Sequence, residues 1–189
     1  TDVGSVPVTV INALAGTGSA TISPDTAGTG QKQDYTVTYT TAGTLDAGGV
    51  SVALPNGWSI AADEDGAARS AKNIVVTTTG VLAETDPITY AATTTVALKT
   101  MAPGQTVTFV LKGVTAPTTI PDPAAIGFVV QSDNGGVDSL GNIAALPPVT
   151  IGSAAAGSGS VAKTAGVNII NSAGDPGTIT LRFTAAGQM

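Results

Sequence analysis

The sequence predicts an all-β protein built as an antiparallel β-sandwich. The first reason is an alternation of apolar and polar residues, seen most clearly where Tyr35, Val37 and Tyr39 alternate with threonines. A period of two places the apolar side chains on one face of a strand. The second reason is that turn-forming residues separate such runs at short intervals, while no segment keeps the 3.6-residue period of a helix.

Seven or eight short strands are expected in order along the chain. After the strand around Tyr35–Tyr39, further strands are expected at residues 50–54, 74–76, 96–98, 107–111, 126–130 and 149–151. Turns are expected where proline fixes φ, or where glycine and asparagine tolerate a positive φ, at residues 23–25, 55–57, 102–104 and 133–136. Residues 61–71 fit either a helical turn or a loop. The single tryptophan, Trp58, is expected to anchor the core beside its turn.

The opening of the chain returns near its end. Three segments recur in the same order: residues 7–10 (PVTV) at 148–151 and 15–20 (AGTGSA) at 156–161, both 141 residues later, and 36–45 (TVTYTTAGTL) at 180–189, 144 residues later. Such a period predicts one complete unit followed by the opening of a second. We therefore expect three parts: residues 1–14 as an N-terminal strand that is either a donor strand or the tail of a preceding repeat, 15–151 as the complete sandwich, and 152–189 as a linker with the opening strands of a second repeat.

Composition excludes several classes of function. The formal net charge of −6 disfavours nucleic acid and anionic membranes, which need a basic surface, and no segment has the length of a transmembrane helix. The chain has neither cysteine nor histidine, so it lacks thiol chemistry and the commonest general base. No residues form a catalytic motif, and we expect no enzyme. Low lysine and aromatic content with much threonine, alanine and glycine is typical of exported surface proteins, so a secreted, cell-surface location is expected.

Two acidic segments are candidates for calcium. Asp133, Asn134 and Asp138 surround a glycine-rich bend, and residues 63–65 form a compact acidic run. Calcium takes six to eight oxygen ligands, more than either segment supplies, and the spacing does not match an EF-hand. A turn without metal is the preferred interpretation of both segments. We therefore expect no bound cofactor, with calcium as the alternative at Asp133, Asn134 and Asp138.

Four segments resemble the immunoglobulin-like repeats of large bacterial and archaeal surface proteins. They are residues 16–24 (GTGSATISP), 35–39 (YTVTY), 47–58 (AGGVSVALPNGW) and 102–109 (APGQTVTF). The resemblance covers residues 15–151 and returns at 156–189. It implies an immunoglobulin-like sandwich that acts as a spacer, stalk or assembly module without an active site.

The N-terminal segment has the sequence of a closing strand and the C-terminal segment has the sequence of opening strands. This complementarity suggests how units join. Val8 and Val10 belong to a closing strand, whereas Ile179, Leu181 and Phe183 form the apolar stripe of an opening strand. We predict a filament or surface-layer polymer of this chain alone, in which neighbouring subunits complete each other's sheets head to tail by β-strand complementation. Other cell-surface components are further candidate partners. The alternative is a spacer or an adhesin or glycan-binding domain within a longer cell-surface repeat protein.

Overall fold

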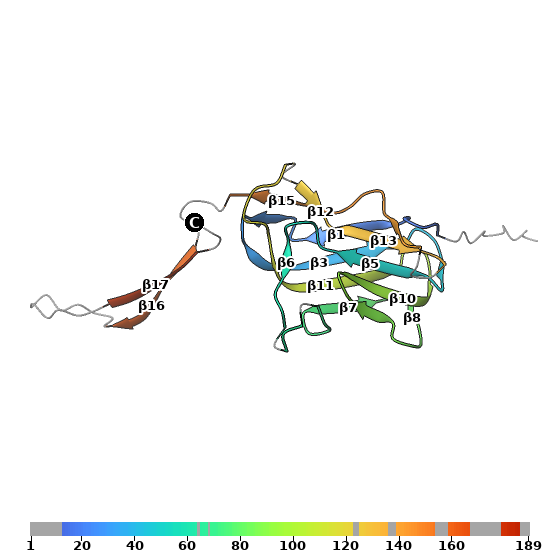
Figure 1. Ribbon diagram of the computed structural model, residues 1–189, viewed down its shortest axis with the longest axis horizontal. Coiled ribbons are helices and arrows are strands. Elements are labelled where there is room, and N and C mark those ends of the chain that lie inside the picture. Colours follow the sequence, from blue (N-terminus) through green and yellow to red (C-terminus); the bar gives the residue numbers. More distant parts are fainter. Residues whose placement is uncertain are drawn as a thin grey trace, which may run out of the picture.

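The computed structural model describes residues 13–63, 65–67, 69–122, 125–135, 139–153, 159–166 and 179–185, and every regular element in these ranges is a β-strand. No helix that could cross a membrane occurs in the described part of the chain. The prediction of an all-β antiparallel sandwich is confirmed. Two sheets face each other, a small third sheet lies at one end, and a two-stranded hairpin lies beyond it (Figure 1).

The first sheet has β3 and β11 at its centre. β3 (Lys32–Thr40) pairs with β1 (Ser19–Ser23) on one edge and with β11 (Thr106–Thr115) on the other. The far edge of β11 is shared by β7 (Ile74–Thr78) and β6 (Ser59–Ile60). All of these pairs are antiparallel. β3 is an interior strand, because β1 and β11 pair with its two edges.

The second sheet is organised around β5 (Gly49–Ala53) and β10 (Thr93–Met101). β13 (Val129–Asp133) pairs with the other edge of β5 and in turn carries β14 (Gly141–Asn142). The remaining strands of this sheet are short and pair with β10: β4 (Leu45–Asp46), β8 (Val81–Leu82) and β9 (Ile88–Tyr90).

The third sheet closes one end of the sandwich. β15 (Pro148–Gly152) lies between β12 (Ala125–Gly127), to which it is antiparallel, and β2 (Thr26–Gly28), to which it is parallel. β16 (Gly159–Gly166) and β17 (Ile179–Ala185) form the separate antiparallel hairpin. The described chain enters the sandwich at the end opposite β15 and the hairpin (Figure 1).

The core lies between the two large sheets and follows the predicted alternation. In β3 the side chains of Tyr35, Val37 and Tyr39 are fully buried, while the threonines between them are partly exposed. Trp58 is buried as predicted, with its ring centroid 5.4 Å from that of Tyr35 and 5.3 Å from that of Phe128. These three rings meet in edge-on and tilted contacts, which favour aromatic packing.

The prediction of one strand over residues 126–130 is wrong. Gly127 ends β12 and Val129 begins β13, and the two strands belong to different sheets. Between them the backbone N–H of Phe128 donates to Pro147 O at 3.2 Å, and its ring is buried against Tyr35 and Trp58. The apolar run is continuous because the chain crosses between two sheets within the core.

The remaining differences concern short elements. Six of the expected strands overlap β3, β5, β7, β10, β11 and β15, whereas most strands of two or three residues were not predicted. Residues 61–71 contain no helix where the structure describes them and form a loop. The turn at 55–57 is confirmed, because Trp58 N donates to Pro55 O at 3.2 Å and Gly57 has φ of +83°.

Candidate assembly surface

The C-terminal hairpin provides two strands in the segment for which the opening strands of a second repeat were predicted. β17 contains Ile179, Leu181 and Phe183, the residues predicted to form an apolar stripe. β16 and β17 pair from Gly159 opposite Ala185 to Gly166 opposite Ile179, with a bulge between Lys163 and Ala165. The other predicted assembly residues, Val8 and Val10, lie outside the described residues.

The hairpin has the same register as the first two long strands of the sandwich. Adding 141 to the numbers of β1 and 144 to those of β3 converts the first four of the five pairs of that ladder into pairs of the β16–β17 ladder. The corresponding pairs are Ser19/Thr40 and Ser160/Thr184, Ala20/Tyr39 and Val161/Phe183, Thr21/Thr38 and Ala162/Arg182, and Ile22/Val37 and Lys163/Leu181. The correspondence ends at the bulge. A one-residue slip would exchange the two faces of a strand, so equal register places the same repeat positions on the same face.

A close contact explains one glycine that the repeat retains. Gly18 has φ of +108°, and a Cβ atom on it would lie 2.5 Å from Cε2 of Tyr39. The positions equivalent to Gly18 and Tyr39 are Gly159 and Phe183, so the glycine and an aromatic residue are both kept. The Tyr39 hydroxyl donates to Thr17 O at 2.8 Å, and the second copy lacks this hydroxyl. The repeat therefore keeps a glycine and an aromatic residue at these two positions, but not the hydroxyl group.

The predicted assembly residues correspond to core positions of the sandwich. Ile179, Leu181 and Phe183 occupy the repeat positions of Tyr35, Val37 and Tyr39, which are fully buried under the second sheet. Val8 and Val10 occupy the positions of Val149 and Ile151 in β15, which are also buried. In the complete unit, each of these positions needs a covering layer of apolar side chains.

The two edges of β17 differ in what they pair with. β17 pairs with β16 along one edge, and up to the bulge it has the Cα register that β3 has with β1. β3 pairs with β11 on its other edge, whereas in the described part of the chain β17 has no second partner strand. An unpaired edge presents backbone donors and acceptors that can bind another strand. We call this edge, with the stripe Ile179, Leu181 and Phe183, the assembly surface.

The segment that enters the sandwich is held firmly. Ala13 is buried and its N–H donates to Thr44 O at 2.8 Å, and Gly16 N donates to Ser132 O at 2.8 Å. A Cβ atom on Gly16 would lie 2.5 Å from the backbone oxygen of Asn142, so only glycine allows this crossing. The sandwich is therefore anchored at its entry by Ala13 and Gly16 and at its opposite end by β15.

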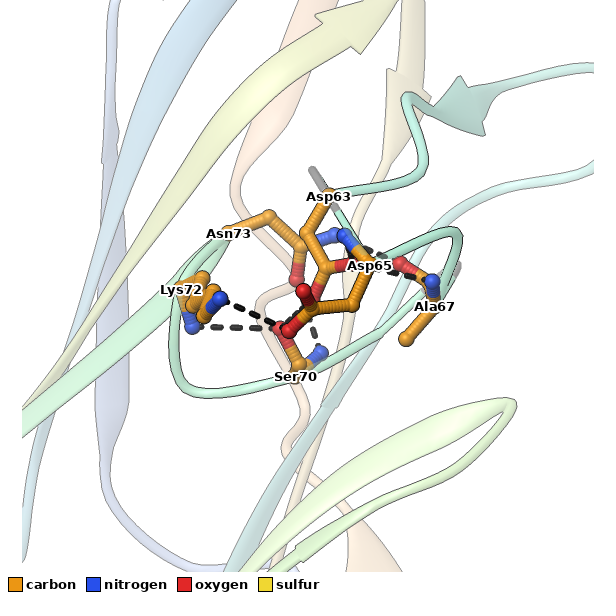
Figure 2. Close-up of polar contacts among 6 residues, drawn as sticks. All are labelled: Asp63, Asp65, Ala67, Ser70, Lys72 and Asn73. Carbon is orange, nitrogen blue, oxygen red and sulfur yellow. Dashed lines mark hydrogen bonds and ion pairs between the residues drawn. The ribbon is translucent and has the colours of Figure 1, made fainter.

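The acidic loop at residues 63–65 is organised by its own hydrogen bonds (Figure 2). The Oδ1 atom of Asp63 accepts from the backbone N–H groups of Asp65 and Ala67, both at 2.9 Å, and its Oδ2 accepts from the Ser70 hydroxyl at 2.5 Å. Donation by Ser70 is the largest of the effects that lower the pKa of Asp63 below its ordinary value. Asp65 forms an ion pair with Lys72 at 2.7 Å. The carboxylates thus stabilise the loop itself.

The calcium candidates are placed only in part. Asp133 lies at the end of β13 and is buried, and its Oδ1 accepts from the N–H of Asn134 at 2.8 Å. The side-chain oxygen of Asn134 accepts from the N–H of Asp46 at 2.6 Å. Asp138 lies outside the described residues. Two of the oxygens proposed as calcium ligands are therefore acceptors of backbone hydrogen bonds, which agrees with the interpretation as a turn.

The fold defines the chain as an all-β sandwich protein that carries an additional two-stranded hairpin. Comparison with known proteins finds no matching family model and no matching curated protein. Among solved structures, the crystal structure of BslA, a bacterial hydrophobin, matches with 21% sequence identity and a TM-score of 0.40, over 72% of this chain and 98% of that one. A likeness at this level assigns neither a family nor a function to the chain.

Proposed function

We propose that this protein is an extracellular structural protein, a subunit of a filament or surface layer in which immunoglobulin-like units join head to tail. In this proposal, the assembly surface of one subunit is completed by β-strands of its neighbour. The interface is heterologous, because the surface that accepts strands differs from the surface that donates them. Such an interface extends into a fibre unless rotation closes it into a ring.

The observation that carries the proposal is the equal register of β16–β17 and β1–β3. The hairpin has the pairing of the opening strands of a sandwich, and its apolar positions are those that the sandwich buries. In the described structure, burial of these positions in the first unit requires the facing sheet of β5, β10 and β13. Completion by a neighbour would supply such a layer and would also satisfy the free backbone groups of β17.

The path of the chain supports units arranged in series. The chain enters at one end of the sandwich and leaves at the other through β15 (Figure 1). Successive units would then extend along one direction instead of folding back on each other. Both ends of the unit are held by backbone hydrogen bonds. Ala13 and Gly16 form them at the entry, and β15 forms them with β12 and β2 at the exit.

The second candidate is a spacer or an adhesin domain of a longer cell-surface polypeptide. One observation favours it: β11, the strand that fills the edge of β3, is also paired with β7 and β6 in its own sandwich. A separate subunit would have to release this strand or add to it, whereas a covalently following repeat brings its own. An adhesin would in addition bind a glycan, which a glycan array tests directly.

Electron microscopy and light scattering of the purified chain test the proposal. We expect fibres from the wild type and dispersed particles from Phe183→Asp, because a carboxylate on the apolar stripe prevents its burial. Ile120→Asp is the matched control, since Ile120 is 48% exposed in the loop after β11 and its substitution leaves β17 unchanged. A wild-type chain that stays monomeric at high concentration would overturn the polymer and favour the spacer.

A further inference from the structure

We propose that the parallel pairing of β15 with β2 makes this unit resist tension applied along the chain. Tension on the preceding chain pulls β2 back from its first residue, Thr26. Tension on the following chain pulls β15 forward from its last residue, Gly152. The proposal concerns a single unit and goes beyond the proposed function, because it applies equally to separate subunits and to units that follow one another in one polypeptide.

The first step of the argument concerns the direction of the two strands. Their ladder begins with Thr26 opposite Thr150. It ends with Gly28 opposite Gly152, so the two strands run in the same direction. The two strand ends that receive the tension therefore lie at opposite ends of the ladder, and the tension slides the strands past each other. In an antiparallel pair these two ends would be adjacent, and the hydrogen bonds would break one after another.

The second step concerns the path of the tension through the unit. The chain enters the sandwich at the end opposite β15, and β1 leads toward the end where β2 and β15 lie (Figure 1). Ala13 and Gly16 hold the entry by backbone hydrogen bonds of 2.8 Å each. Tension on the two ends of the unit therefore acts along its length.

The third step concerns the bonds that hold β15. It is the central strand of its sheet, with β2 on one edge and β12 on the other. The N–H of Thr150 donates to Asp25 O at 2.9 Å, just before β2 begins. The N–H of Thr29 donates to Gly152 O at 2.9 Å, just after β2 ends. The pairing of β2 with β15 is thus bonded at both of its ends.

The fourth step concerns the side chains beside this pairing. Ala27 of β2 is 7% exposed, and Val149 and Ile151 of β15 are 0% and 2% exposed. Hydrogen bonds are electrostatically stronger where water is excluded. Sliding β15 out of its sheet would also remove Val149 and Ile151 from the core, which costs the free energy of exposing apolar surface. Backbone pairing and side-chain burial therefore oppose the same movement.

Single-molecule force spectroscopy of the full chain tests the proposal. The chain has no cysteine, so a pair of introduced cysteines defines where the force acts. In L14C/S153C the force acts beyond both strands, at two exposed residues. In T29C/S153C it acts at the neighbouring ends of β2 and β15, and peels them apart. We expect the unfolding force of L14C/S153C to be at least about twofold higher, because its geometry loads the bonds of the ladder together.

A second pair of variants, made in L14C/S153C, tests the hydrogen bond at Thr150. Thr150→Pro removes the N–H that donates to Asp25 O and should lower the unfolding force. Thr150→Ala is the matched control, because it keeps the N–H and the side chain it shortens is exposed. It should leave the unfolding force unchanged. The same unfolding force in both variants would overturn the proposal.

The comparison of the two pulling geometries does not depend on whether the proline variant folds. Equal unfolding forces for L14C/S153C and T29C/S153C, or a higher force for T29C/S153C, would overturn the proposal. Microscopy of the unmodified chain reports separately on the proposed function. Fibres without a difference in force refute the role of the β2–β15 pairing alone, and a difference in force without fibres refutes the polymer alone.

Discussion

The side-chain oxygen of Asn134 accepts a hydrogen bond from the backbone N–H of Asp46 at 2.6 Å, across 88 positions of the sequence. This contact connects the end of β13 to β4 in the second sheet. Because this oxygen holds the Asp46 N–H, and because the described residues contain no group of three or more Asp, Glu, His or Cys that could hold a metal ion, we expect neither calcium nor EDTA to shift the melting temperature, which calorimetry measures. A calcium-dependent rise of several degrees would contradict this expectation.

The same contact predicts the effect of Asn134→Ala. The substitution leaves the Asp46 N–H without its acceptor, so the free energy of unfolding should fall by about 1 kcal/mol. Denaturant unfolding followed by tryptophan fluorescence measures the change. Asn56→Ala, in the exposed turn before Trp58, is the control and should have a smaller effect.

Gly18→Ala should be among the most damaging small substitutions. The new Cβ atom would lie 2.5 Å from the Tyr39 ring and 2.7 Å from Thr40 O, in addition to requiring φ of +108°. We expect a loss of at least about 2 kcal/mol. Gly104→Ala separates the two causes, because Gly104 has φ of +80° with no atom within 4 Å of the added Cβ. Equal losses in the two variants would exclude the steric contact as the cause.

Phe128→Ala should destabilise the sandwich by about 3–5 kcal/mol, the usual cost of removing a buried aromatic side chain. The ring is fully buried between Tyr35 and Trp58, at the point where the chain passes from β12 to β13. Chemical denaturation measures the loss. Phe128→Leu keeps much of the volume and should cost less, so a Leu variant as unstable as the Ala variant would contradict packing as the cause.

Ser70→Ala should raise the pKa of Asp63 toward its ordinary value, since Ser70 donation is the largest cause of its depression. A depressed pKa contributes stability above the unfolded-state pKa, and this contribution is lost as the pH falls through the folded-state pKa. The loop of the variant should therefore lose less stability on acidification. Carboxyl NMR titration measures the pKa. Lys72→Ala is the comparison and should shift it less, because the Lys72 charge is the smallest contribution.

Local pattern was sufficient to predict much of this protein. The alternation around Tyr35 and Val37 reflects burial on one side of a strand, and a proline or glycine at each turn constrains φ, so both are evident in neighbouring residues. The repeat likewise predicted the strands of the hairpin from their similarity to the opening strands. The assembly residues were proposed from the same comparison, because the equivalent positions of the complete sandwich are buried.

Contacts between distant residues were decided only by the tertiary structure. The crossing at Phe128 depends on Pro147 and on the facing rings, and the role of the Asn134 oxygen depends on Asp46. The two-residue strands exist only because a long strand lies beside them. The pairing of β3 with β11 is set in the same way, since more than sixty residues of sequence separate the two strands. In the described part of the chain, β17 has no such second partner. Hydrogen bonds across a sheet join residues without regard to sequence distance, and a local pattern therefore cannot specify which strand lies at which edge.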